Sequence, residues 1–279
     1  YIFILITSIT ITGYGKIFCK FFNINCKSTS LEIIFGCFFL GSLALVINFF
    51  FPINKILTNI IFIFGIFLFF YSFKNNQNEI KYLLIIVFIA FLTGIYETSN
   101  RPDAGLYHLP YISNLNENKI IIGLNNLHSR FGFTSFLQYI SSIFNNSFVS
   151  TKAIFFPNLI IYAASLLYFY RLCIDSKMSN EIRILALFFG ISIAVDMNRF
   201  SEFGNDENAH MLFFIFITNF IIYFNKGNLK TDNYIKIILL LSLFLFMIKV
   251  TYSILIILII YIIFNSFKTF KLFEKINIF

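Results

Sequence analysis

The stretch "LEIIFGCFFLGSLALVINFFF", residues 31–51, decides the fold class. It contains one charged residue, Glu32, and it is long enough for a helix that crosses a bilayer, which needs about 20 mostly apolar residues. Runs of the same kind recur at 1–18, 54–73, 80–97, 151–172, 183–199, 208–225, 234–248 and 250–267. The sequence therefore predicts an all-α, polytopic transmembrane bundle of about nine spans, interrupted by one long polar segment.

The composition also indicates a membrane protein. Of the 279 residues, 58% are hydrophobic and only 12% are charged, a balance that leaves too little polar surface for a water-soluble domain. The net charge of +8 does not indicate nucleic-acid binding, because the lysines lie in short loops between apolar runs and form no basic face interleaved with aromatic residues. We expect an integral, multi-pass protein of a bacterial inner membrane, surrounded by membrane lipid.

The polar interruption divides the chain into three segments. Residues 1–97 and 151–279 are expected to be transmembrane helices, and residues 98–150 an exoplasmic loop. Since the chain starts at Tyr1 inside an apolar run and stops at Phe279 without a polar tail, we expect it to be a piece of a longer protein. The four cysteines show neither a CxxC pair nor a metal-ligand spacing, so we expect no disulfide and no thiol chemistry.

The positions of the basic residues predict the orientation. With residues 98–150 outside, roughly two-thirds of the lysines and arginines fall on the cytoplasmic side, as the positive-inside rule requires. Residues 234–267 are compatible with a hairpin around "KVTYS" or with one long helix, and the charge distribution favours the hairpin.

Chemistry is concentrated in "RPDAGLYHLPYISNLNENKIIIGLNNLHSRFGF", residues 101–133, which holds two of the three histidines. Two amphipathic helices, at 106–117 and 133–145, are expected to lie along the outer surface. Asp103 precedes the first, where its carboxylate either caps the helix amides or faces a site.

Two further polar positions fall on the same predicted side. In the loop 196–210, Asp206 and His210 are four residues apart at a helix start and share a face, with Glu207 beside them. Lys249 lies between apolar runs and must snorkel, pair with an acid or meet a ligand anion. No HExxH motif fixes a zinc site, but a loosely held Mg²⁺ or Mn²⁺ ion bridging Asp103, Asp206 and Glu207 to phosphate is compatible with the pattern.

The order of these motifs resembles the GT-C membrane glycosyltransferases, and most closely their dolichyl-phosphate-mannose protein mannosyltransferase-like branch. The resemblance rests on "DAGLYHLP", on "GLNNLHSRFGFTSFLQYISSIF" running into a span, on Asp206 in "GNDENAHMLFF" and on "FMIKVTYSIL", over roughly residues 80–267. The acidic pair usual in the family is only Asp103-Ala104 here, and about four spans precede the loop instead of one. The chain therefore resembles a divergent branch with an N-terminal extension.

The resemblance implies transfer of a sugar from a polyprenyl-phosphate donor to a lipid, glycan or protein acceptor on the exoplasmic face. It implies Asp103 as the catalytic base that takes the acceptor's proton. Lys249, Arg130 and Arg199 are the implied ligands of the donor phosphate, whose charge grows in the transition state. The implied substrate-binding residues are Tyr107, His108, His128, Asp206, Glu207 and His210.

Other classes of protein share part of this pattern. A polymerase or ligase of lipid-linked glycans would also carry a large exoplasmic loop. A transporter would place charges in mid-membrane helices, often broken at Gly or Pro in repeated halves, and no internal repeat is evident. A structural membrane subunit would explain the hydrophobicity but not the clustering of Asp, His and Arg.

Overall fold

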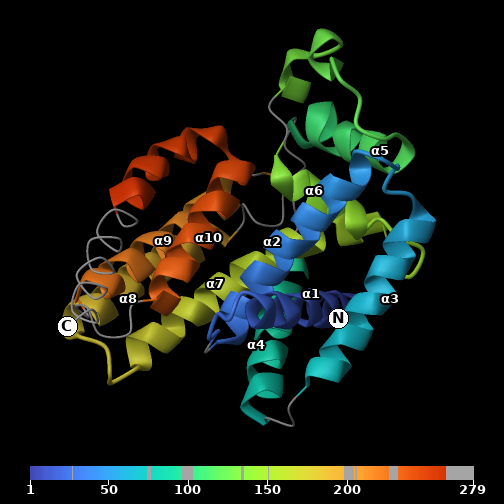
Figure 1. Cartoon of the computed structure of the whole chain (residues 1–279). Helices are drawn as coiled ribbons and strands as arrows, with labels where there is room; N and C mark the ends of the chain where they lie inside the picture. The colour runs from blue at the N-terminus through green and yellow to red at the C-terminus, as the bar shows by residue number, and fades with distance from the viewer. Residues whose placement is uncertain are drawn as a thin grey trace, which may run out of the picture.

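The computed structural model describes residues 1–26, 28–73, 77–95, 103–132, 135–149, 151–197, 204, 206–225 and 232–261. Of these described residues, 84% are helical and none lies in a strand, which confirms the all-α expectation (Figure 1). The long helices are α1 (Ile2–Phe21), α2 (Thr29–Asn48), α3 (Lys55–Ser72), α4 (Gln77–Ile95), α7 (Phe156–Ile174), α8 (Asn180–Val195), α9 (Asp206–Asn225) and α10 (Asp232–Ile248). The short ones are η1 (Ala104–His108), α5 (Leu109–Glu117), η2 (Leu124–Asn126), η3 (Ser129–Gly132), α6 (Phe136–Ile143), η4 (Thr151–Phe155) and η6 (Val250–Ile254).

Six helices of the described chain are long and apolar enough to cross a membrane: α1 to α4, α9, and α7 extended back to Ala153. The sequence predicted about nine. The other three expected spans lie in the C-terminal half. Helix α8 has 16 residues and α10 has 17, both shorter than the roughly 20 that a perpendicular crossing needs, and the run 250–267 lies in part outside the described residues. The described chain therefore has six candidate membrane spans, an arrangement compatible with a multi-pass membrane protein.

Helix α1 packs between α2 and α3, and small residues allow the close approach. A Cβ atom at Gly15 would collide with the backbone carbonyl of Glu32 on α2, and one at Gly13 would collide with the carbonyl of Gly65 on α3. Because lipid supplies no hydrophobic drive for helix association, close van der Waals packing of this kind holds membrane helices together.

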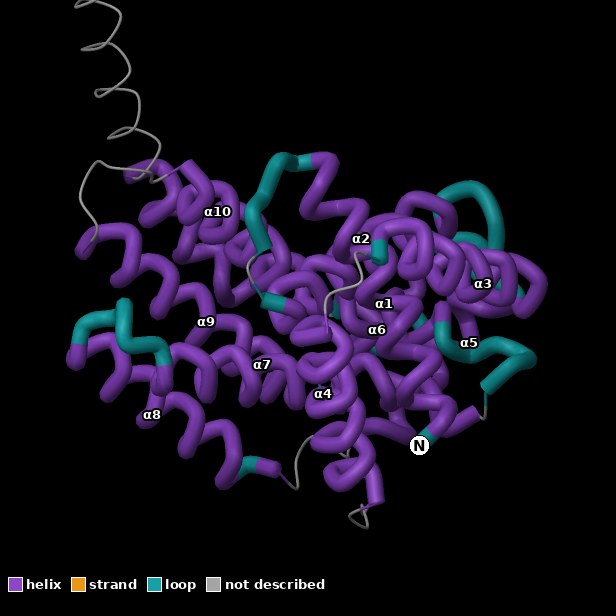
Figure 2. The backbone as a smooth tube through the Cα atoms, turned by 90° about the horizontal axis from the view of Figure 1, so that it is seen from below, coloured by secondary structure: helices purple, strands orange, loops and turns teal. Residues whose placement is uncertain are grey.

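Helix α7 joins this N-terminal group to the C-terminal helices. It contacts α2 and α4 on one side and α8 and α9 on the other, and α10 packs against α9. Figure 2 shows α7 between α4 and α9, with α8 at the edge of the molecule. The core is continuous across both groups, so the chain forms one hydrophobic unit.

The segment 103–149 is tied to one end of the bundle, called here the loop end. The side chain of Asn48, at the end of α2, donates to the carbonyl of Asn118 at 3.0 Å. The side chain of Asn116 donates to the carbonyls of Ile53 at 2.7 Å and Ser142 at 3.1 Å. These side-chain amides, of buried Asn48 and half-buried Asn116, satisfy backbone groups that helices cannot pair at a bundle end.

The opposite end, called the basic end, joins the termini of other helices. The Asn25 backbone amide donates to the side chain of Asn233 at 2.7 Å, and Lys236 Nζ donates to the carbonyl of Phe22 at 3.2 Å. The basic residues of the described helices and turns at this end are Lys16, Lys20, Lys81, Arg171, Lys177, Arg183 and Lys236, whereas the loop end has Lys55, Lys119, Arg130, Lys152 and Lys249. The helix ends thus place the basic residues as the positive-inside argument expects, and the orientation itself stays a prediction.

The second expected surface helix is in fact buried. All eight residues of α6, Phe136–Ile143, are buried, and the helix packs against α2, α3, α5 and α7. The amphipathic pattern was misleading, because the polar face of α6 is covered by α5 and carries Gln138, which has partners inside the protein. Helix α5 lies over it, within the range predicted for the first surface helix.

The chain breaks its helix after α10, and two cysteines near the end of α1 form a disulfide. Helix α10 ends at Ile248, Lys249 is extended (φ −149°, ψ 118°), and the chain turns through η6, so 234–261 is not one continuous helix.

The expectation of no disulfide was wrong, since Cys19 and Cys26 are bonded. The turn after α1 brings their Cα atoms to 6.5 Å, a separation that a disulfide spans and that the seven-residue spacing alone did not reveal.

Candidate active site at the loop end

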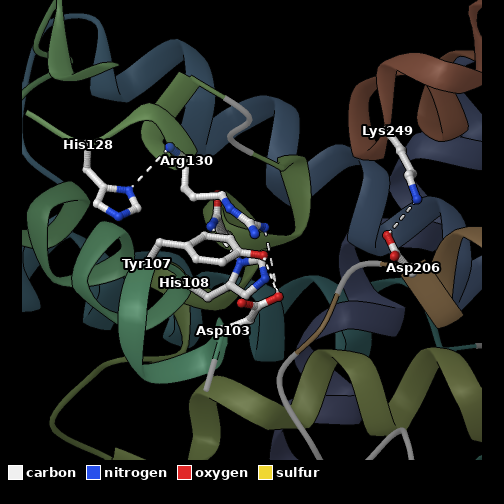
Figure 3. A network of polar contacts seen from close by, with 8 residues as sticks. Asp103, Tyr107, His108, His128, Arg130, Asp206 and Lys249 are labelled. Atoms are coloured by element: carbon white, nitrogen blue, oxygen red, sulfur yellow. Dashed lines mark hydrogen bonds and ion pairs between the residues drawn. The ribbon is translucent and has the colours of Figure 1, made fainter. Parts of the chain in front are cut away.

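Asp103 lies at the start of η1, a single π-helical turn, at the loop end. Its side chain makes no capping hydrogen bond, so the capping interpretation was wrong. Instead the Tyr107 hydroxyl donates to Asp103 Oδ2 at 3.4 Å, and Arg130 Nη1 lies 3.9 Å from the same oxygen (Figure 3). The wider turn places Tyr107, four residues on, over the carboxylate.

Arg130 comes from η3, the far side of the same segment, and completes the cluster. Its guanidinium carbon lies 5.3 Å from the centre of the Tyr107 ring, within the range of a cation–π contact. The side chains of Asp103 and Arg130 are each 53% exposed. Exposure and a distance of 3.9 Å make the ion pair weak, since surface pairs contribute only about 0–1 kcal/mol.

His108 lies beneath this cluster and is buried. Its Nδ1 is 2.9 Å from Gln138 Nε2 of α6, and because an amide NH₂ can only donate, Nδ1 accepts and the ring proton lies on Nε2. Burial lowers the pKa of His108 to about 4, and the nearby Asp103 and Asp206 carboxylates oppose that shift only in part. His108 is therefore neutral at pH 7 and close to both carboxylates.

A second ion pair lies beside this cluster. Lys249 Nζ is 2.8 Å from Asp206 Oδ1, joining the end of α10 to the first turn of α9. The side chains are 37% and 60% exposed, respectively. The sequence left three possibilities for Lys249: snorkelling, pairing with an acid or contact with a ligand anion. The structure shows the pair with an acid. Figure 3 shows both pairs in one region, with His108 toward Asp103.

The other predicted residues are not part of these contacts. His128 points away from Asp103, and its Nδ1 accepts from the Arg130 backbone amide at 3.2 Å, so it shapes the loop (Figure 3). Glu207 and His210 lie on α9 near Asp206, and His210 is exposed. Arg199 lies outside the described residues.

The proposed metal ligands do not form a metal site in the described part of the chain. No group of three or more His, Cys, Asp or Glu side chains there is arranged to hold an ion. Asp103 faces Arg130 and Asp206 faces Lys249, so each carboxylate is already opposed by a cation.

A cavity of about 400 Å³ lies between the two cation-bearing segments. Its wall includes Phe131, which follows Arg130, and Met247, two residues before Lys249. Tyr111 and Tyr139 line the same space, and their hydroxyls are 3.3 Å apart. None of the residues that line this cavity is Asp, Glu, Lys, Arg or His, so its wall is uncharged. Burial also raises the pKa of Tyr139.

Sequence reasoning missed Gln138, which holds His108. Gln138 is 1% exposed, and its side-chain oxygen accepts from the Ser135 amide at 2.8 Å as half of a capping box. The signal was present in "SFLQ", because a serine followed three residues later by glutamine marks a helix start. That signal locates Gln138 at the first turn of α6 but does not reveal its contact with η1.

Comparison with known proteins gives a family but no activity. No curated protein and no solved structure matches the chain. One family model matches residues 1–279, the whole chain. The chain therefore belongs to the DUF8201 family, described as a domain of unknown function.

Proposed function

We propose that the protein is a GT-C-type membrane glycosyltransferase that moves a sugar from a polyprenyl-phosphate donor to an exoplasmic acceptor. The observation that carries the proposal is the Asp103–Tyr107–Arg130 cluster with the Lys249–Asp206 pair beside it at the loop end. A carboxylate and two cations with an uncharged cavity between the cation-bearing segments match the needs of this reaction. The cluster joins motifs from three separate parts of the sequence.

Asp103 is the proposed base. The acceptor hydroxyl oxygen bonds to the anomeric carbon, the bond from that carbon to the phosphate oxygen breaks, and the hydroxyl proton passes to the Asp103 carboxylate. Tyr107 donates to Oδ2 and so fixes the orientation of the carboxylate. General bases positioned in this way typically accelerate a reaction by about 10²- to 10⁴-fold.

Arg130 and Lys249 are the proposed partners of the leaving phosphate, and Arg199 is kept in that role as a prediction. Both described cations are paired with exposed carboxylates, and such pairs exchange readily because each contributes only about 0–1 kcal/mol. The donor phosphate would take the place of the carboxylates. Releasing Asp103 from Arg130 as the donor binds would also free its carboxylate for the acceptor proton.

The cavity of about 400 Å³ is the proposed position of the first isoprenoid units. Its wall is mostly aromatic and aliphatic, with Asn125 and Ser135 as uncharged polar members, and it lies between the segments that carry the two cations. Tyr107, His108, Asp206, Glu207 and His210 remain candidates for orienting the sugar, and a bound Mg²⁺ or Mn²⁺ remains a prediction.

The finer topology belongs to the same proposal. With α8, α10 and residues 250–267 crossing the bilayer at their shorter length, the count reaches about nine spans and places residues 98–150 outside. The donor tail would lie in the outer leaflet of a bacterial inner membrane. The acceptor would be a lipid, glycan or protein.

The test is sugar transfer in membranes that contain the full-length protein. Radiolabelled polyprenyl-phosphate sugars are supplied to the wild type, to Asp103→Asn and to Glu117→Gln. Glu117 is a matched control, an exposed acid of the same segment that accepts from Ser113 at 3.0 Å. We expect Asp103→Asn to lower transfer by about 10²-fold or more, and Glu117→Gln to leave it unchanged. Equal transfer by all three proteins would refute Asp103 as the base.

A further inference from the structure

A second cavity, of about 720 Å³, lies at the basic end, opposite the candidate active site. It is enclosed by the starts of α2, α4 and α10 and by the ends of α7 and α9. The proposed reaction takes place at the other end of the same helices and makes no use of it.

Arg171, in the last turn of α7, is the cation of this cavity. Its guanidinium carbon lies 4.4 Å from the centre of the Tyr82 ring of α4. Within the described ranges no carboxylate lies within ion-pair distance of it. Asp175 also lines the cavity, but Asp175 Oδ1 accepts from the Lys177 backbone amide at 3.0 Å within its own turn. Stacking holds the guanidinium plane while its N–H edges can meet an anion.

The depth of the cavity matches that of lipid head groups. It lies where apolar spans end, with Tyr82, Tyr168 and Tyr234 in its wall, and tyrosine is enriched at this level of a bilayer. Lys20, Lys177 and Lys236 belong to the same end, where seven described basic residues stand against five described acidic ones, Glu32, Glu79, Asp175, Glu181 and Asp232. Basic pockets between transmembrane helices on the cytoplasmic side are typical binding sites for anionic lipid head groups.

The rest of the wall suits an acyl chain. Leu31, Leu172, Ile222 and Ile237 line the cavity beside Arg171, so a ligand bound there meets one cation and an apolar surface. A soluble phosphate would contact the cation and leave the apolar surface in contact with water. An amphiphile would contact both the cation and the apolar surface.

We propose that this cavity binds an anionic phospholipid, with the phosphate on Arg171 and an acyl chain along the apolar wall. The site is independent of the proposed transferase chemistry, because its residues lie at the other end of the bundle.

The experiment measures the thermal unfolding temperature of the full chain in a neutral detergent. Phosphatidylglycerol, phosphatidylcholine or inorganic phosphate is added to the wild type, to Arg171→Gln and to Lys20→Gln. Lys20 is the matched control, an exposed cation of the same end that does not line the cavity. We expect phosphatidylglycerol to raise the unfolding temperature of the wild type and of Lys20→Gln by a few degrees, with at least a tenfold higher lipid concentration needed for Arg171→Gln.

Three results would overturn the proposal. One is an equal shift with phosphatidylcholine, and another is an equal shift in Arg171→Gln. The third is an Arg171-dependent shift with inorganic phosphate alone, which would assign the site to a soluble anion. If Arg171→Gln does not fold, Arg171→Lys takes its place. It keeps the charge but loses the planar fork, so it should bind phosphatidylglycerol more weakly than the wild type.

Discussion

Acidification should destabilise the protein through His108. The ring is buried, and its pKa falls from 6.5 to about 4 because burial disfavours the charged form. The folded state therefore resists a proton that the unfolded chain accepts. The stability that comes from keeping His108 neutral is present above pH 6.5 and is lost as the pH falls from 6.5 toward 4.

The magnitude follows from the two pKa values. The unfolded chain has a His108 pKa of 6.5 and the folded protein one of about 4. The unfolding free energy should therefore fall by about 2 kcal/mol when the pH is lowered from about 7 to about 4.5. The variant His108→Phe cannot take up this proton. Over the same pH range, the unfolding free energy of His108→Phe should fall by about 2 kcal/mol less than that of the wild type.

The assay is chemical unfolding in mixed micelles at both pH values. The variant also loses the hydrogen-bond acceptor of Gln138. This loss lowers the unfolding free energy by the same amount at both pH values, so it does not affect the difference between them. His210→Gln controls for the replacement of a histidine as such, because His210 is exposed. The same pH dependence in the wild type and His108→Phe would refute the assignment of a buried, neutral His108.

Three further outcomes follow from the packing and the ion pairs. Gly15→Ala should destabilise the fold by about 1–3 kcal/mol, because the new methyl group meets the Glu32 carbonyl. Gly105→Ala is the control, because its methyl group would enter open space. Unfolding temperatures in detergent should be lower for Gly15→Ala than for Gly105→Ala. Lys249→Met should change the unfolding free energy by less than about 1 kcal/mol, since the pair with Asp206 is exposed, yet it should lower sugar transfer; a large loss of stability with unchanged transfer would contradict its proposed role. Lys16→Met should cost about 3 kcal/mol, because it leaves Glu79, whose side chain is only 14% exposed, without its partner. Unfolding in mixed micelles should show Lys16→Met/Glu79→Met to be more stable than the single variant.

Apolar runs predicted the six long helices, because a helix that crosses lipid leaves a contiguous, nearly charge-free stretch in the sequence. The count of about nine spans is not confirmed in the C-terminal half, where α8 and α10 are short. The same rule also did not distinguish α6, buried among other helices, from a helix lying on the surface. An amphipathic pattern reports two kinds of face and does not say what covers the polar one.

The candidate site was predictable in its residue types and not in its contacts. Asp103, Tyr107 and Arg130 were all candidates, and they meet. Their meeting depends on the π-helical turn of η1 and on the path of the loop to η3, which no local pattern encodes. Pairing was one of the outcomes expected for Lys249, but its partner, Asp206, lies 43 residues away along the chain, so only the packing of α10 against α9 selects it.

The most direct test of the central claim is release of polyprenyl phosphate from a polyprenyl-phosphate sugar by the purified full-length protein with acceptor present. The account predicts release that requires the acceptor and that falls by about 10²-fold or more in Asp103→Asn, while donor binding by the variant is retained. Absence of release from every donor by a folded wild-type protein, or full release by Asp103→Asn, would contradict it.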